Sequence, residues 1–176
     1  METAGPWSRL SLVLAYSTEA HLHVRDLNQS PFNVGRTLEL GDLSPDQITA
    51  LNGLYGAPLD TAQLARLRAV VDGHPGLLNR SFAELERGTV NLDDLERQAA
   101  QGGGIFAAHL QRLWESLRRS PELCDVLRAL LQRRETPGDD EFLRLRSAGI
   151  LAGPAPESAR IRCGLYADYF GRHLGK

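Results

Sequence analysis

Apolar residues recur at helical spacing in four successive segments between residues 41 and 103. Each segment opens on residues that favour a helix start, and glycine stands where the first two segments stop. The predicted starts are Ser44-Pro45, Asp60 or Thr61, Pro75 and Asn91, and the predicted stops are Gly56 and Gly73. The pattern predicts four short helices connected by tight turns.

Beyond Gly102-Gly103-Gly104, which we interpret as a hinge and a domain boundary, three more segments carry apolar stripes. Two short segments, Ile150-Leu151 and Arg160–Arg162, are then placed to pair across a loop rich in proline and serine. A final helical pattern begins near Leu165. Helix, helix, helix, hairpin is the element order of a winged helix-turn-helix.

The N-terminal region has a different pattern. Arg9–Tyr16 is a short and nearly continuous apolar run, as in a strand that is covered on both faces of a parallel sheet. Thr37–Leu40 alternates polar and apolar residues and predicts a second short strand. Parallel strands need crossover connections, and the sequence leaves room for at most one. We therefore expect a remnant of a sheet within a mainly α (α+β) fold.

Charge and cysteine content limit the classes of function that are compatible with this sequence. The chain carries 20 basic and 22 acidic residues, and residues 104–176 hold 12 basic against 9 acidic residues. That small excess is too weak for a committed nucleic-acid binder. Cys124 and Cys163 are far apart, without zinc spacing, and no apolar stretch is long enough to span a bilayer. We expect a cytoplasmic protein with reduced thiols and no membrane contact.

The sequence lacks a phosphate-binding loop. It contains no Gly-x-x-x-x-Gly-Lys-Ser/Thr run, and the one lysine is Lys176. Gly73-His74-Pro75 stands between two helical patterns. A glycine that ends one helix and a proline that begins the next are common at such a position, whether or not a ligand binds there.

Several motifs in order resemble a known family. They are Tyr16-Ser17-Thr18-Glu19, Gln29–Gly35, Leu43–Gln47, Leu51–Gly56, Gly73-His74-Pro75 and Leu165–Phe170. Together they resemble the C-terminal portion of the AAA-like domain of bacterial STAND-type signalling NTPases. The resemblance implies a remnant of an α/β nucleotide-binding domain (1–40), a helical lid (41–103) and a winged-helix domain (104–176).

The same resemblance implies the site residues. Gly73, His74 and Pro75 match the family's Gly-x-Pro, whose proline packs near the adenine, and would be a vestigial nucleotide contact. Without a phosphate-binding loop or the acidic metal-binding strand, ATP hydrolysis by this chain alone is not expected. ATP or ADP would be a cofactor only with a partner that supplies the loop, and otherwise we expect none.

Three functions are compatible with these expectations. The first is a non-catalytic regulatory or protein-interaction module, in which Leu12, Val13 and Leu14 complete a sheet in a partner or drive self-association. The second is a winged-helix DNA-binding regulator, with candidate contacts at Arg144, Arg146, Arg160 and Arg162. The third is one half of a split ATPase; the chain would then be a fragment or a split gene product.

The DNA hypothesis meets an electrostatic obstacle. The predicted recognition helix, about residues 139–148, opens with Asp139-Asp140-Glu141, whose charges would repel phosphates. Protein contact is therefore the favoured use of this region. His21 and His23 alternate on a predicted strand but lack a third metal ligand, and Asp93-Asp94 is explained by stabilisation of a helix start. No metal site is expected, and no nucleophile stands in a catalytic arrangement.

Overall fold

The computed structural model describes Val13, Leu38, residues 40–132 and residues 135–175. The chain divides into two compact units, residues 1–37 and residues 38–176. All the helices and strands that the model describes belong to the second unit. The strand predicted at 9–16 lies outside the described residues except for Val13, and His21 and His23 are not described. Of the strand predicted at 37–40, Leu38 and Leu40 are described, and neither is in a strand.

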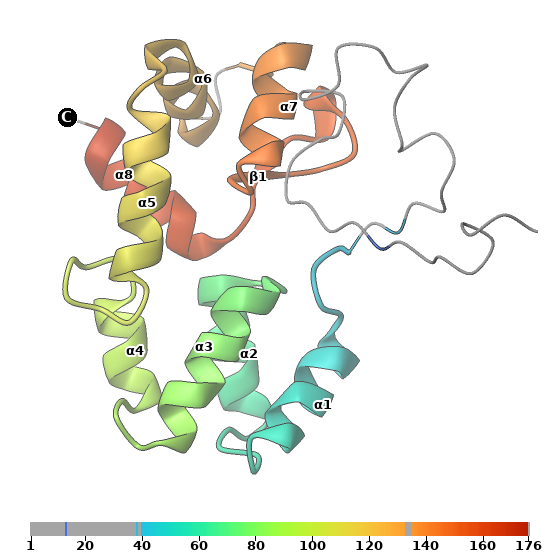
Figure 1. The fold of residues 1–176 in the computed structure, drawn as a ribbon, viewed down its shortest axis with the longest axis vertical. Coiled ribbons are helices and arrows are strands. Elements are labelled where there is room, and N and C mark those ends of the chain that lie inside the picture. The colour runs from blue at the N-terminus through green and yellow to red at the C-terminus, as the bar shows by residue number, and fades with distance from the viewer. Residues whose placement is uncertain (1–12, 14–37, 39, 133–134, 176) are drawn as a thin grey trace, which may run out of the picture. The chain divides into compact units, whose positions relative to one another are not determined.

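The second unit is mainly helical, which confirms the mainly α character expected from the sequence (Figure 1). Its described strands form one two-stranded sheet. In chain order the α-helices and strands are α1 (Pro45–Leu54), α2 (Thr61–Val71), α3 (Pro75–Glu86), α4 (Leu92–Gln98), α5 (Ala107–Leu117), α6 (Pro121–Leu131), α7 (Asp139–Ser147), β1 (Leu151–Ala152), β2 (Arg160–Ile161) and α8 (Gly164–Leu174).

Side-chain caps explain where the first helices begin. Ser44 Oγ accepts a hydrogen bond from the Gln47 backbone N–H, and Gln47 Oε1 accepts one from the Ser44 backbone N–H. Asp60 and Gln63 form the same reciprocal pair at the start of α2. Asn91 accepts from a backbone N–H at the start of α4. Each cap satisfies backbone donors that have no partner within the helix, and these predicted starts are confirmed.

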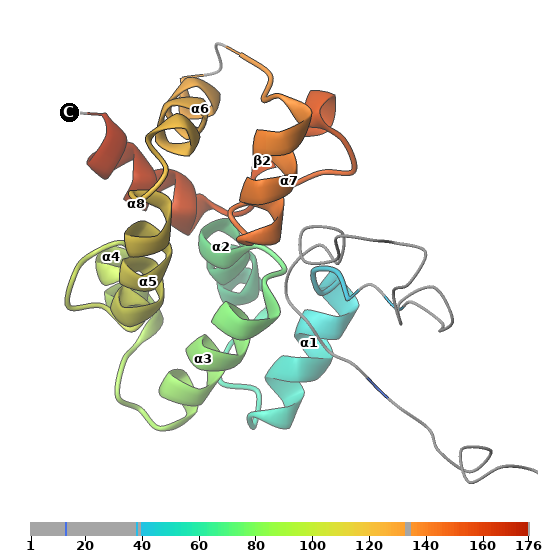
Figure 2. The same ribbon diagram turned by 45° about the horizontal axis from the view of Figure 1, so that its top comes forward.

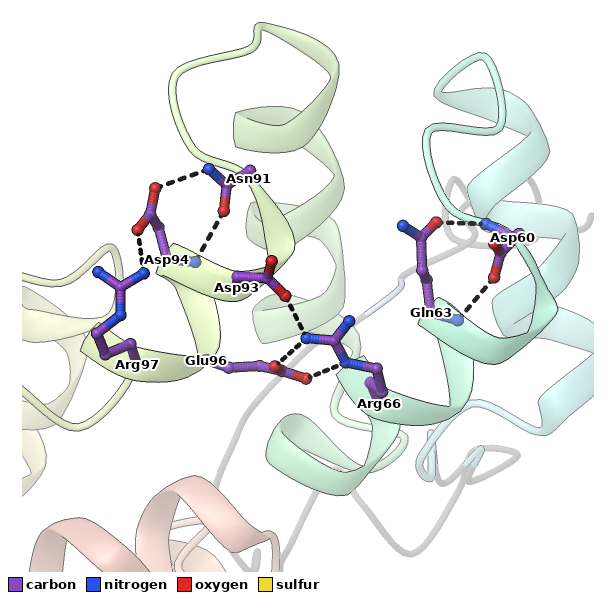
Figure 3. A network of polar contacts seen from close by, with 8 residues as sticks. All are labelled: Asp60, Gln63, Arg66, Asn91, Asp93, Asp94, Glu96 and Arg97. Atoms are coloured by element: carbon purple, nitrogen blue, oxygen red, sulfur yellow. Dashed lines mark hydrogen bonds and ion pairs between the residues drawn. The ribbon is translucent and has the colours of Figure 1, made fainter.

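An exposed ion-pair network joins α2 to α4 (Figure 3). Arg66 on α2 donates to both Asp93 and Glu96 on α4. The hydrogen bond from Arg66 also holds the pKa of Asp93 below its usual value. Asp94 lies on the other side of the helix start, where it pairs with Arg97 at 2.7 Å. The two adjacent aspartates therefore serve the cap and the helix–helix contact.

The helices gather at two ends of the unit (Figures 1 and 2). At one end α1 contacts α3, and α2 contacts α4. At the other end α6 contacts α7 and α8, and α5 lies beside both α6 and α8. The contact between α2 and α8 joins the two ends across the boundary predicted after residue 103. That boundary stays a prediction.

The predicted pairing of two short C-terminal segments is confirmed. Strands β1 and β2 are antiparallel, with Leu151 opposite Ile161 and Ala152 opposite Arg160. The Arg162 backbone N–H extends the pairing by donating to the Ile150 carbonyl at 2.9 Å. The hairpin thus leads directly into α8.

Helix α8 supplies much of the core at the meeting point of the two ends. Tyr166 is 1% exposed, and Phe170 is fully buried. The helix begins against the last turn of α2, so closely that a Cβ on Gly164 would lie 2.5 Å from the Ala69 carbonyl oxygen. A glycine at this position therefore permits the α2–α8 contact.

The glycine run 102–104 forms a turn against the end of α4. A Cβ on Gly104 would lie only 2.1 Å from the Gln98 carbonyl oxygen, whereas Gly102 and Gly103 have open space around them. The requirement for glycine is thus confined to one of the three residues, and its cause is a close backbone approach.

Candidate functional site

The turn Gly73-His74-Pro75 connects α2 to α3, and its glycine acts differently from the helix stop expected. The residue with a positive φ after α2 is Asp72, at φ 50°, so the assignment of this stop to Gly73 was wrong. Gly73 instead lies against the segment that precedes α1. A Cβ there would be 2.6 Å from the Leu43 carbonyl oxygen and 2.8 Å from Asp42 Cβ.

This close approach is reinforced by a backbone hydrogen bond. The Leu43 N–H donates to the Gly73 carbonyl at 2.8 Å. The chain entering α1 is thereby fixed against the turn that enters α3. Any side chain at Gly73 would push these two backbone segments apart.

His74 caps α3, and Pro75 occupies its first helical position. The His74 Nδ1 atom accepts from the Leu77 backbone N–H at 3.4 Å, an interaction that requires an unprotonated Nδ1. Burial, followed by the charge of Arg162 and by His109, lowers the pKa of His74 to about 4. The neutral imidazole is therefore the capping form near neutral pH.

His74 faces two aromatic side chains from the other end of the unit. Its ring centroid lies 5.9 Å from that of His109 on α5 and 6.1 Å from that of Tyr166 on α8, both edge-on. His109 Nε2 and the Tyr166 hydroxyl are 2.6 Å apart, so the buried hydroxyl has a partner. Burial lowers the pKa of His109 and raises that of Tyr166.

An ion pair completes this group. Arg162, which follows β2, donates to Asp42 Oδ1 from Nη2 at 2.6 Å and from Nε at 3.1 Å. Both side chains are largely shielded, with exposed fractions of 21% and 26%. We call Asp42, His74, His109, Arg162 and Tyr166 the junction cluster. It joins the segment before α1 and the α2–α3 turn to α5, β2 and α8.

The junction cluster is suited to holding two groups of helices together in one arrangement. Each of its side chains makes at least one hydrogen bond or ion pair within the cluster or to the adjoining backbone. The neighbouring thiol of Cys163 is buried, and burial raises its pKa to about 11, so it remains protonated. Among the described residues, no group of three or more His, Cys, Asp or Glu is placed to hold a metal ion.

The four arginines considered for DNA contact are engaged with the protein in different ways. Arg160 lies 3.4 Å from Asp72, and Arg162 pairs with Asp42. Arg144 on α7 lies 3.1 Å from Glu122 and 3.7 Å from Asp140, and Arg146 is half-buried on the same helix. Three of these arginines already lie beside carboxylates of the protein, so the four do not form the continuous free positive surface that an extended phosphate backbone needs, and the arrangement does not favour DNA contact.

The predicted interaction strand falls mainly outside the described residues. Leu12 and Leu14 are not described, and the Val13 side chain is 90% exposed.

Sequence reasoning found Gly73-His74-Pro75 but missed two partners of His74. His109 stands in an ordinary helical pattern without any spacing signal. Tyr166 was noted only as part of the closing motif Leu165–Phe170, and nothing in the sequence indicates that its hydroxyl meets an imidazole 57 residues away.

The fold and this junction define a mainly helical unit in which a glycine–histidine–proline turn packs against α5 and the C-terminal helix α8. The AAA-like domain family matches residues 1–172, and the chain belongs to that family. No curated protein and no solved structure matches the chain. Among the described helices, none combines the length and the apolar character needed to cross a bilayer.

Proposed function

We propose that the chain is a non-catalytic regulatory module of the STAND type, acting in the cytoplasm through contact with another protein chain. Helices α1–α4 form the lid, and α5–α8 with the β1–β2 hairpin form the winged helix. The sequence has no phosphate-binding loop, so the module does not hydrolyse ATP by itself.

The observation that carries this proposal is the position of the Gly73-His74-Pro75 turn. In a nucleotide-driven switch of this type, the corresponding turn faces the nucleotide, and the winged helix closes over it. Here His74 packs edge-on against His109 and Tyr166, side chains of α5 and α8. A lid and a winged helix held together by such contacts can report a partner's state by staying docked or separating.

The same position favours a second candidate function. A chain that retains the Gly-x-Pro turn at the start of α3 could serve as the lid half of a split ATPase. In that case ATP or ADP binds only after assembly with a partner that supplies the phosphate-binding loop. Pro75 would then pack near the adenine of the bound nucleotide.

The interaction is assigned to the N-terminal apolar run that includes Leu12, Val13 and Leu14. Val13→Lys places a charge at a side chain that is 90% exposed. We expect the unaltered chain to self-associate with rising concentration in sedimentation equilibrium, and V13K to remain monomeric because a buried lysine charge disfavours the interface.

The matched control is Leu54→Lys. Leu54 is also an exposed large apolar residue, 83% exposed at the end of α1, but it lies outside the apolar run. L54K should associate like the unaltered chain. A monomer at every concentration, or equal association of V13K and the unaltered chain, would overturn the assigned interface.

A further inference from the structure

A surface groove of about 290 Å³ lies where the last turn of α2 meets β2 and the first turn of α8. Three arginines are among the residues that line it, Arg68, Arg160 and Arg162, together with one acidic residue, Asp72. The groove therefore carries a net positive charge. Guanidinium groups gathered in a concave surface are the usual protein partners of phosphate, because their planar N–H donors match its oxygens.

The arginines differ in how strongly the protein already engages them. Arg162 is committed to Asp42 at 2.6 Å. Arg160 is held loosely, at 3.4 Å from Asp72 and 3.2 Å from the Arg162 carbonyl oxygen. Arg68 has no ion-pair partner among the described residues. Arg68 and Arg160 thus retain N–H groups that can donate hydrogen bonds to a bound anion.

The start of α8 adds to the positive potential of the groove. This helix has eleven residues, no acidic residue in its first turn and no side-chain hydrogen bond at its N-cap, Cys163. The positive end of its dipole therefore contributes beside the arginines without a compensating carboxylate of its own. The helix end supplements the arginine cluster, which is the main feature of the site.

We propose that this groove binds a phosphate dianion, either inorganic phosphate or the phosphate group of a small monoester, between Arg68 and Arg160. Its volume suits one phosphate with a small substituent and is near the lower limit for ligand pockets. Because Arg68 lies on α2 and Arg160 on β2, the bound anion bridges these elements. The proposal goes beyond the regulatory function and requires neither a partner chain nor residues 1–37.

The test is calorimetric titration of the full chain with inorganic phosphate and, separately, with glycerol phosphate. Ionic strength is kept constant with sodium chloride, so that a general salt effect is excluded. Arg68→Gln and Arg160→Gln each remove a guanidinium group from the groove. Arg87→Gln is the matched control, because Arg87 is similarly exposed and has a similarly long ion pair, at 3.5 Å to Glu84 on α3.

The unaltered chain and R87Q should bind at least one of the two anions saturably, with one site. R68Q and R160Q should each lose about tenfold or more in affinity, the usual effect of removing a charge-assisted hydrogen bond. Thermal melting without phosphate checks that each variant folds. Tighter binding of glycerol phosphate than of inorganic phosphate would assign the site to an ester; the reverse would assign it to the free ion.

Two results would overturn the proposal. One is the absence of saturable binding of either anion to the unaltered chain. The other is binding that R68Q and R160Q leave unchanged, which would place the anion elsewhere on the protein.

Discussion

His74 combines two requirements in one side chain. Its Nδ1 atom caps α3, and its ring packs against His109 and Tyr166. Both requirements favour the neutral imidazole, because protonation removes the acceptor and places a charge beside Arg162. Burial of the ring, followed by the charge of Arg162 and by His109, lowers the pKa of His74 to about 4.

This residue should make the fold sensitive to acid. The folded-state pKa of His74, about 4, lies below its ordinary value of 6.5, so the unfolded chain binds the proton first as the pH falls. The contribution of His74 is therefore complete above pH 6.5 and is lost progressively between pH 6.5 and 4. His109, whose pKa is also lowered, acts in the same direction.

We expect His74→Asn to reduce this loss. Asparagine keeps an N-cap acceptor but does not titrate, so the melting temperature of H74N should fall less than that of the unaltered chain as the pH is lowered from 6.5 to 4. His173→Asn, outside the junction cluster, is the control for removal of an imidazole. Equal acid dependence of H74N and the unaltered chain would show that His74 does not contribute.

At the scale of single elements, α8 contains two glycines whose surroundings differ. Gly164 begins the helix against the Ala69 carbonyl oxygen, whereas a Cβ on Gly171 would meet nothing within 4 Å. The same substitution therefore tests close packing at one position and helix propensity at the other.

Gly164→Ala should destabilise the protein, because its Cβ would lie 2.5 Å from a backbone oxygen that cannot rotate away. Separating α8 from α2 should cost about 1–3 kcal/mol, as overpacking does elsewhere. Gly171→Ala should stabilise the protein by up to about 1 kcal/mol, the propensity difference between glycine and alanine within a helix. Urea unfolding of both variants measures the difference, and equal effects would contradict the packing argument.

The elements themselves were largely predictable from the sequence. Ser44, Asp60 and Asn91 were recognisable as caps, since local side-chain chemistry decides where a helix starts. The hairpin was predictable from two short segments, Ile150-Leu151 and Arg160–Arg162, on either side of a loop rich in proline and serine. The role of Gly73 was not, because it depends on Leu43, which is distant in sequence, and a glycine that permits a close approach looks like one that stops a helix.

At the scale of the whole described unit, the junction cluster joins residues far apart in the chain. Asp42 and Arg162 are 120 positions apart, so their ion pair fixes the entry to α1 relative to the entry to α8. No local pattern could predict this pairing, because the sequence offers many aspartates and arginines and no rule for matching them over such distances.

A double-mutant cycle with Asp42→Asn and Arg162→Gln should give a coupling free energy of about 1 kcal/mol or more, since both side chains are largely shielded from water. The control cycle uses Asp168→Asn and Arg172→Gln, a pair on α8 with the same 2.6 Å separation but exposed fractions above 50%. That pair should couple by only about 0.3–0.5 kcal/mol. Equal couplings in the two cycles would show that the shielding of the first pair does not matter.

The anchoring of residues 42 and 43 also determines how the unit responds to mechanical tension. The ion pair of Asp42 and the hydrogen bond from Leu43 to Gly73 stand between residues 1–37 and α1 along the chain. A pull on the N-terminal residues therefore reaches these two contacts before it reaches α1. The force is first borne by the hairpin and by the α2–α3 turn, to which these contacts lead. A force applied to the N-terminal residues therefore acts on the contact between the two groups of helices while α1 is still folded.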